Sequence, residues 1–119
     1  DGLICYGVLY YCKKDEIERA IREMHRTLKN DAIGLLVVRA TKDYRFGHGL
    51  EVENNTFITE ENDGDKCAFN ENGMTMHFFT REELRDLFKE FKSLEIDEIV
   101  ETHESGKYCD ANFVIKFEK

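Results

Sequence analysis

The sequence predicts an α/β protein whose elements run strand, helix, strand, long loop, helix and antiparallel strand hairpin. Two apolar runs, at residues 2–9 and 33–40, flank a helical repeat, which is typical of a βαβ unit with a right-handed crossover. Near the C-terminus, residues 94–104 and 111–119 alternate apolar and polar side chains, which predicts two paired strands. The length of 119 residues fits one domain over residues 1–119.

The first strand is expected at residues 2–9, within the run DGLICYGVLYY. A nearly unbroken apolar run is typical of a strand that is buried on both faces, in the middle of a parallel sheet. We therefore expect a neighbouring strand to come from sequence before Asp1 or from a second chain.

The first helix is expected from about Glu16 to Leu28, because apolar residues recur there at helical spacing. Asp15, with Glu18 three residues later, resembles a capping box. After a turn at Asn30-Asp31, the run IGLLVVRA predicts a second strand that is again buried on both faces.

Residues 41–73 are rich in Gly, Asn and acidic side chains, and little regular structure is expected there beyond a short strand at 55–59. A connection this long is usually functional or disordered. The segment MTMHFF is expected to be briefly extended, and T-x-x-E at Thr80–Glu83 predicts the start of a helix over residues 81–91.

Composition argues against several classes of function. The net charge of −8 disfavours nucleic acid as a partner, because an acidic surface repels phosphate. No run is long enough to span a membrane, so a membrane partner is not expected either. The four cysteines form no C-x-x-C pair and the four histidines have no metal-ligand spacing. Free thiols and a cytoplasmic location are therefore expected, with no metal site.

Several segments together resemble the C-terminal half of a class I S-adenosylmethionine-dependent methyltransferase. DGLICYGVLYY resembles the fourth strand and its G-V-L turn, and REMHRTLKNDAIGLLVV resembles the following helix and fifth strand. MHFFTREELRDLFKEF resembles the start of the next helix, and the last two strands resemble the closing hairpin of that sheet. GHGLEVENNTF resembles an insertion seen in some small-molecule methyltransferases, so residues 41–73 are interpreted as an acceptor-side insertion.

The chain departs from the family in two places. Asn30-Asp31-Ala32 replaces the usual Pro-Gly-Gly turn, a change that turn-forming residues tolerate. The glycine-rich loop and the acidic residue that hold most of the cofactor in the family are absent. The resemblance thus implies methyl transfer from S-adenosylmethionine to a small-molecule acceptor, by a chain that is not expected to be active alone.

The resemblance also implies a cofactor-binding segment at Cys5, Tyr6 and Gly7, which lines the ligand through backbone groups. Gly7 has the strongest indication of the three, because a glycine in a bulky run permits close approach or unusual dihedral angles. A plain bend at the end of the strand is the alternative.

Substrate-binding candidates lie where the predicted parallel strands end, since ligands of open α/β sheets bind there. Tyr10 and Tyr11 begin the loop after the first strand and either wall the acceptor pocket or pack on the helix. Arg39, at the end of an apolar strand, either binds an anionic substrate or pairs with a nearby carboxylate. Arg45 is a candidate for covering the acceptor.

The catalytic candidates are Tyr44 and His48. His48 lies between two glycines and is the best general-base candidate, because its ordinary pKa is near neutral. A simply exposed histidine is the alternative, and Tyr44 is interpreted as part of a lid over the acceptor.

A second hypothesis needs no catalysis. An apolar strand without a neighbour is a template for pairing, so the chain could be a non-catalytic half-domain that associates through residues 2–9.

Overall fold

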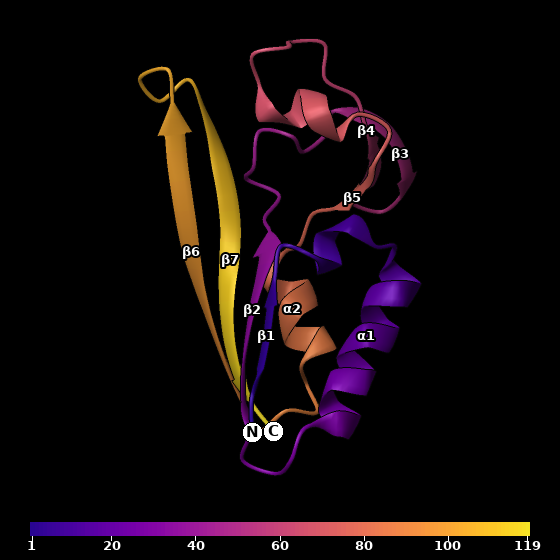
Figure 1. Cartoon of the computed structure of the whole chain (residues 1–119), viewed down its shortest axis with the longest axis vertical. Coiled ribbons are helices and arrows are strands. Elements are labelled where there is room, and N and C mark those ends of the chain that lie inside the picture. Colours follow the sequence, from indigo (N-terminus) through magenta and orange to yellow (C-terminus); the bar gives the residue numbers. More distant parts are fainter.

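The computed structural model describes residues 1–119 and confirms the predicted α/β architecture. The first part of the chain forms β1 (Leu3–Tyr6), a 3-10 turn η1 (Leu9–Tyr11), α1 (Lys14–Thr27) and β2 (Ile33–Arg39) (Figure 1). Its last part forms α2 (Arg81–Leu87), β6 (Ser93–His103) and β7 (Tyr108–Glu118). No helix has both the length and the apolar character needed to cross a membrane.

The main sheet has the strand order β1-β2-β7-β6. β1 and β2 are parallel, as expected for a βαβ unit, while β7 runs antiparallel to both β2 and β6. The last strand therefore inserts between β2 and β6. β6 and β7 pair over their full length and extend past the end of β2 as a two-stranded ribbon (Figure 1).

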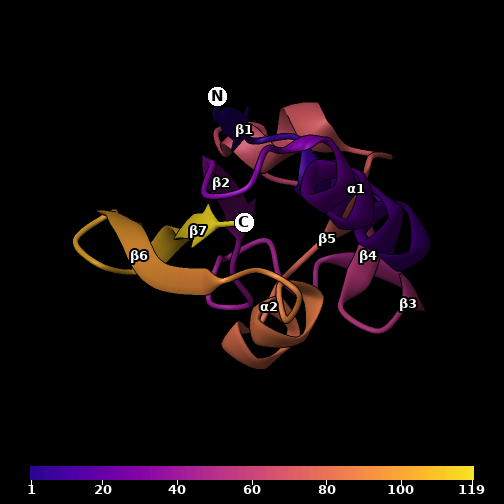
Figure 2. The same ribbon diagram turned by 90° about the horizontal axis from the view of Figure 1, so that it is seen from below.

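Both helices cover the same face of this sheet, as the view from below shows (Figure 2). The core under them is apolar and includes Ile17 and Leu36, with Phe117 packed against Phe88 and Phe91, which follow the end of α2. Gly34 has to be glycine, because a Cβ at this position would lie 2.1 Å from the Phe117 ring. The core thus depends on one aromatic side chain that rests directly on the backbone of β2.

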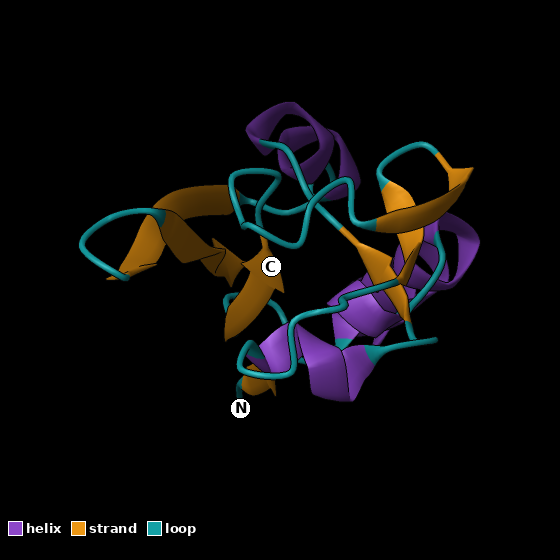
Figure 3. Cartoon of the chain, turned by 90° about the horizontal axis from the view of Figure 1, so that it is seen from above, coloured by secondary structure: helices purple, strands orange, loops and turns teal.

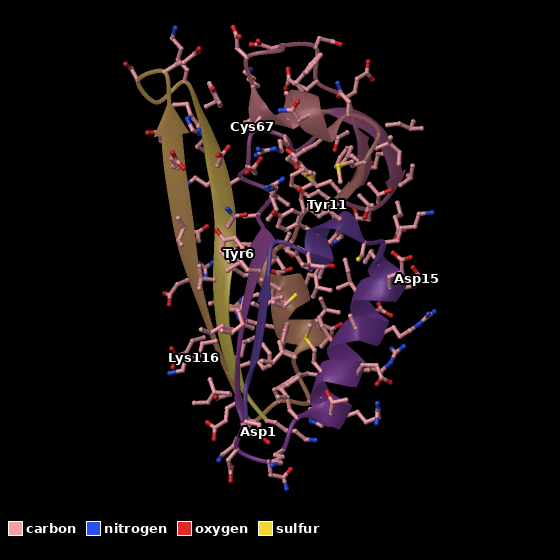
Figure 4. The ribbon with its side chains drawn as sticks, in the orientation of Figure 1. Asp1, Tyr6, Tyr11, Asp15, Cys67 and Lys116 are labelled. Atoms are coloured by element: carbon pink, nitrogen blue, oxygen red, sulfur yellow. The ribbon has the colours of Figure 1, made fainter.

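The expectation that the two parallel strands are buried on both faces is wrong for this chain. Ile4 and Tyr6 of β1 are 80% and 73% exposed, and Ile33 and Leu35 of β2 are exposed on the same side. Side chains alternate between the two faces of a strand, and the helices of this chain cover only one of them. Figure 4 shows Tyr6 on the side of the sheet away from α1.

The insertion, residues 41–73, is more regular than expected. β4 (Thr56–Thr59) confirms the predicted short strand, and it pairs with β3 (Gly49–Glu53) and β5 (Thr75–His77) in a second sheet of order β3-β4-β5. A second 3-10 segment, η2, covers Cys67–Glu71. Seen from above, this small sheet lies to one side of the main sheet, on the same side as the helices (Figure 3). β3 was not predicted, although Leu50-Glu51-Val52-Glu53 alternates apolar and polar side chains, and both of its apolar side chains are exposed.

The helix ends differ from the expected ones. α1 begins after Lys13, whose backbone N–H donates to the Glu16 carboxylate at 2.9 Å, so the expected box at Asp15 and Glu18 does not form. Thr80 does cap α2, because its hydroxyl accepts from the Glu83 N–H at 3.2 Å. α2 ends at Leu87, four residues earlier than expected.

Candidate functional site

Three of the predicted site residues converge on one carboxylate that the sequence did not single out. Glu71, at the end of η2, accepts from the Tyr11 hydroxyl at 2.8 Å, from Arg45 Nε at 2.8 Å and from Arg39 Nη1 at 3.3 Å. Tyr11 comes from η1 and Arg39 from the end of β2, so Glu71 ties the insertion to the carboxyl ends of both parallel strands. Figure 4 shows Tyr11 below the insertion. We call these four side chains the Glu71 cluster.

Arg39 is buried and largely satisfied by the protein itself. Its guanidinium lies 4.3 Å from the centre of the Tyr10 ring, and Nη2 donates to the Tyr10 hydroxyl at 3.3 Å. Its Nε makes no hydrogen bond and lies 3.7 Å from the Asp43 carboxylate. Of the two interpretations of Arg39, the structure contains the carboxylate pair, which is what a buried guanidinium requires.

The Arg45 guanidinium donates hydrogen bonds to three carboxylates. Nη1 donates to Asp43 at 3.0 Å and to Asp110 of β7 at 3.2 Å, while Nε binds Glu71. Asp43 also accepts backbone N–H groups from Arg45 and Ala111. Burial opposes the charge of Arg45, but Asp43 and Glu71 more than offset it and raise the pKa of the guanidinium. A substrate role for Arg39 or Arg45 stays a prediction, because each guanidinium already has protein partners.

The ionised form of Glu71 is stabilised by its neighbours. Burial alone raises the pKa of this carboxyl, yet the Tyr11 hydrogen bond and the cations of Arg45 and Arg39 outweigh burial and lower the pKa. Burial and the same hydrogen bond raise the pKa of Tyr11, so its hydroxyl stays protonated and continues to donate. The cluster is therefore a charged network at neutral pH.

We expect this network to lose stability in acid. Because the pKa of Glu71 is lower in the folded chain, its contribution is complete above the ordinary glutamate pKa of about 4.3 and is lost as pH falls through the folded value. Glu71→Gln is expected to lower the free energy of unfolding at pH 7 by about 1.5–3 kcal/mol and to reduce the loss below pH 4. Urea unfolding at a series of pH values measures both. An unchanged acid profile in Glu71→Gln, with exposed Glu95→Gln as the control, would contradict this assignment.

The predicted cofactor segment lies at the carboxyl end of β1. Gly7 has φ +68°, a left-handed value that disfavours other residues, and a Cβ there would lie 3.2 Å from the Tyr10 hydroxyl. The Cys5 side chain points toward the helix-covered core and burial raises the pKa of its thiol, whereas Tyr6 points to the open face. In this segment the Cys5 side chain is therefore turned away from a ligand at the strand end, while the Tyr6 side chain is exposed.

The structure brings the two catalytic candidates together. The rings of Tyr44 and His48 are 6.4 Å apart at their centres, edge to face. The Tyr44 hydroxyl accepts from the Ala68 N–H at 3.1 Å, and burial raises the pKa of this phenol, so it is protonated at neutral pH. His48 has a 43% exposed side chain, with Nδ1 3.4 Å from Glu61. His48 is therefore the more accessible of the two side chains, and the catalytic roles of both stay predictions.

A second buried network lies outside all the predicted site residues. His77 of β5 is fully buried, with Nδ1 2.6 Å from the Thr56 hydroxyl and Nε2 2.7 Å from the Glu83 carboxylate. Hydroxyl, imidazole and carboxylate in this order resemble a nucleophile triad, but Thr56 is also fully buried and no substrate can reach it. These side chains join the small sheet to α2.

The surface grooves do not enclose a ligand. A groove of about 270 Å³ lies between α1 and α2, lined by Ile21, His25 and Phe91 among others. The groove that reaches a predicted site residue runs beside Tyr44 and Tyr108, between the insertion and the ribbon, and it is open to solvent.

The arrangement of strands, helices and insertion defines the class of fold, and solved structures share it. A methyltransferase from Methanosarcina mazei, described as dependent on S-adenosylmethionine (SAM), matches 99% of this chain and 58% of its own, with a TM-score of 0.65 and 20% identity. A SAM-dependent methyltransferase from Anabaena variabilis matches 97% of this chain and 47% of its own, with a TM-score of 0.64 and 16% identity.

A third structure comes from Thermotoga maritima and is described as a SAM-dependent methyltransferase, possibly a histamine N-methyltransferase. It matches 100% of this chain and 56% of its own, with a TM-score of 0.58 and 20% identity. No family model and no curated protein matches the sequence.

The chain has the fold of the C-terminal half of a class I SAM-dependent methyltransferase. It spans about half the length of the solved structures it matches. The predicted fold class is confirmed, and with it the structural resemblance that the segment order indicated.

Proposed function

We propose that this chain forms the acceptor side of a methyltransferase that moves a methyl group from S-adenosylmethionine to a small molecule. The observation that carries the proposal is the sheet order β1-β2-β7-β6, together with the match of nearly the whole chain to methyltransferase structures. In a displacement of this kind, much of the rate enhancement comes from holding the acceptor close to the methyl group.

In this proposal, each predicted site residue has a role that follows from its place in the fold. Gly7, with the backbone of Cys5 and Tyr6, approaches the cofactor at the end of β1. Tyr10, Tyr11 and Arg39 lie beneath the insertion and Arg45 lies within it, and Glu71 holds Tyr11, Arg39 and Arg45 in place by hydrogen bonds. His48 takes the proton from the acceptor and Tyr44 orients it.

Cofactor binding by this chain requires a glycine-rich loop that its sequence does not contain. The unpaired edge of β1 and the exposed apolar face of Ile4, Tyr6, Ile33 and Leu35 are where we propose that further polypeptide packs. That polypeptide is either an N-terminal half of the same protein or a second chain.

Calorimetry with S-adenosylmethionine tests the proposed cofactor site. We expect no saturable binding by the chain from Asp1 to Lys119, and tight binding by a form extended through coding sequence before Asp1 that carries G-x-G-x-G. In the extended form, Gly7→Val is expected to abolish binding, while Gly64→Ala, at a glycine with open space around it, is the matched control. Tight binding by the unextended chain would defeat the proposed cofactor site.

Catalysis is tested separately in the extended form. His48→Ala is expected to lower methyl transfer to an accepted small molecule by about 10²–10⁴-fold while leaving cofactor binding unchanged. An unaltered rate would remove His48 from the mechanism without touching the cofactor proposal.

One observation favours a second candidate function, a non-catalytic half-domain that associates through β1. The open edge and the apolar face suit strand pairing. Light scattering distinguishes the two, since a stable monomer counts against association through β1 with a second copy.

A further inference from the structure

We infer that the ribbon formed by β6 and β7 carries a divalent metal site, made by Glu101, His103 and Asp110, with Zn²⁺ as the ion it fits. One ligand atom from each side chain lies within 4.8 Å of the other two. The inference does not rest on the proposed methyl transfer, and its three ligands are not among the residues assigned to it.

Strand geometry puts the three side chains on one face. Glu101 and His103 are two apart on β6, and Asp110 is the direct cross-strand partner of Glu101. Residues two apart on a strand, and directly paired residues on neighbouring strands, point to the same side of a sheet. The ribbon therefore presents an imidazole and two carboxylates to one point.

Stacking fixes the plane of the His103 ring, but the ring nitrogen Nε2 has no hydrogen-bond partner. The ring stacks on Tyr108 with centres 4.9 Å apart, which fixes its plane. Nε2 is buried and has no hydrogen-bond partner, although a carboxylate oxygen of Asp110 lies 3.3 Å away. Nε2 and that oxygen are therefore close together and available to a shared ligand.

The separation itself fits a shared metal. Zinc–nitrogen and zinc–oxygen bonds of about 2.0–2.2 Å in a tetrahedral site place neighbouring ligand atoms about 3.3–3.5 Å apart. The His103–Asp110 distance of 3.3 Å is such an edge. Glu101 is exposed, so its side chain is free to close the third position.

The type and number of ligands are compatible with Zn²⁺. One imidazole and two carboxylates suit Zn²⁺, and a set of three protein ligands leaves a fourth position for water. The other oxygen of Asp110 accepts from Arg45 Nη1 at 3.2 Å, which orients this ligand as outer partners do in metal sites. Because Arg45 belongs to the insertion and Asp110 to the ribbon, a bound ion would also stabilise the contact between these two parts.

Titration calorimetry with Zn²⁺, followed by Co²⁺ absorption spectra, tests the site on the purified chain. We expect binding of one ion per chain, and His103→Ala to weaken it by at least about tenfold, with His25→Ala unchanged. His25 is the matched control, because it lies near Glu90 on the opposite side of the molecule. The Co²⁺ spectrum should show tetrahedral bands without a sulfur charge-transfer band.

The exposed Glu101→Gln variant decides the matter if His103→Ala does not fold, since it removes a ligand from the surface. Zn²⁺ that binds Glu101→Gln as tightly as the unaltered chain would overturn the proposal. So would binding that is lost in Cys67→Ser, which would assign the metal to the exposed thiol.

Discussion

Asp43→Ala is expected to lower the free energy of unfolding by about 3–5 kcal/mol, the loss typical of removing one partner from a buried ion pair. The Asp43 side chain is fully buried and accepts from Arg45 Nη1 and from two backbone N–H groups. Its removal leaves these donors without an acceptor and leaves Arg45 with less compensation for its buried charge. Urea unfolding followed by circular dichroism measures the change.

Matched variants separate charge from packing at this position. Asp97→Ala, at an exposed position of β6, should change stability by no more than about 0.5 kcal/mol. The double variant Asp43→Asn/Arg45→Met should lose less than the sum of its single changes, because the two side chains interact directly. A loss below about 1 kcal/mol for Asp43→Ala would show that the network contributes little to stability.

Phe117→Ala is expected to have an effect of similar size, about 3–5 kcal/mol, for a different reason. Phe117 is fully buried, with its ring centre 4.9 Å from those of both Phe88 and Phe91. The Gly34 backbone beneath it has no side chain to move into the space. The cavity left by alanine therefore cannot close, and thermal or urea unfolding should show the full loss.

Phe117→Leu is the informative companion, because it keeps apolar volume and should lose clearly less than alanine. Phe69, on η2, is 44% exposed, and Phe69→Ala should be close to neutral. Equal losses for Phe117→Ala and Phe69→Ala would show that the core is not centred where the structure puts it.

Periodicity was sufficient for the main sheet. The apolar runs, the helical repeat and the closing alternation placed β1, α1, β2, β6 and β7 in the right order, although β1 ends at Tyr6, three residues before its predicted end. In the insertion it was not used fully: Leu50-Glu51-Val52-Glu53 alternates apolar and polar side chains as a strand does, yet β3 was not predicted, and its apolar side chains turn out to be exposed. It also overstated burial, since an apolar run does not tell whether this chain covers both faces of the strand.

The candidate site was predicted less completely than the fold. Tyr11, Arg39 and Arg45 were singled out by residue type and by their places near strand ends, and the structure brings them together. Their shared partner, Glu71, was missed within an acidic, glycine-containing stretch of no evident pattern. The sequence offered one indication of such a partner, because an arginine at the end of an apolar strand needs a carboxylate nearby.

The proposed metal site shows the same difficulty. Histidine spacing along the sequence indicates no metal, because the ligands sit on two strands and meet through cross-strand pairing of Glu101 with Asp110. Register between strands is set by the turn and the core face, and it is not visible in the spacing of either strand alone.

By itself, the sequence determined the class of fold, the order of its elements and the apolar surfaces that each presents, since these follow from local periodicity. The tertiary structure alone decided which charges meet. The contacts of Glu71 with Tyr11, Arg39 and Arg45 span 60, 32 and 26 residues of chain. Contacts over such separations depend on where the folded sheet and insertion place each strand end, so no local pattern can encode them.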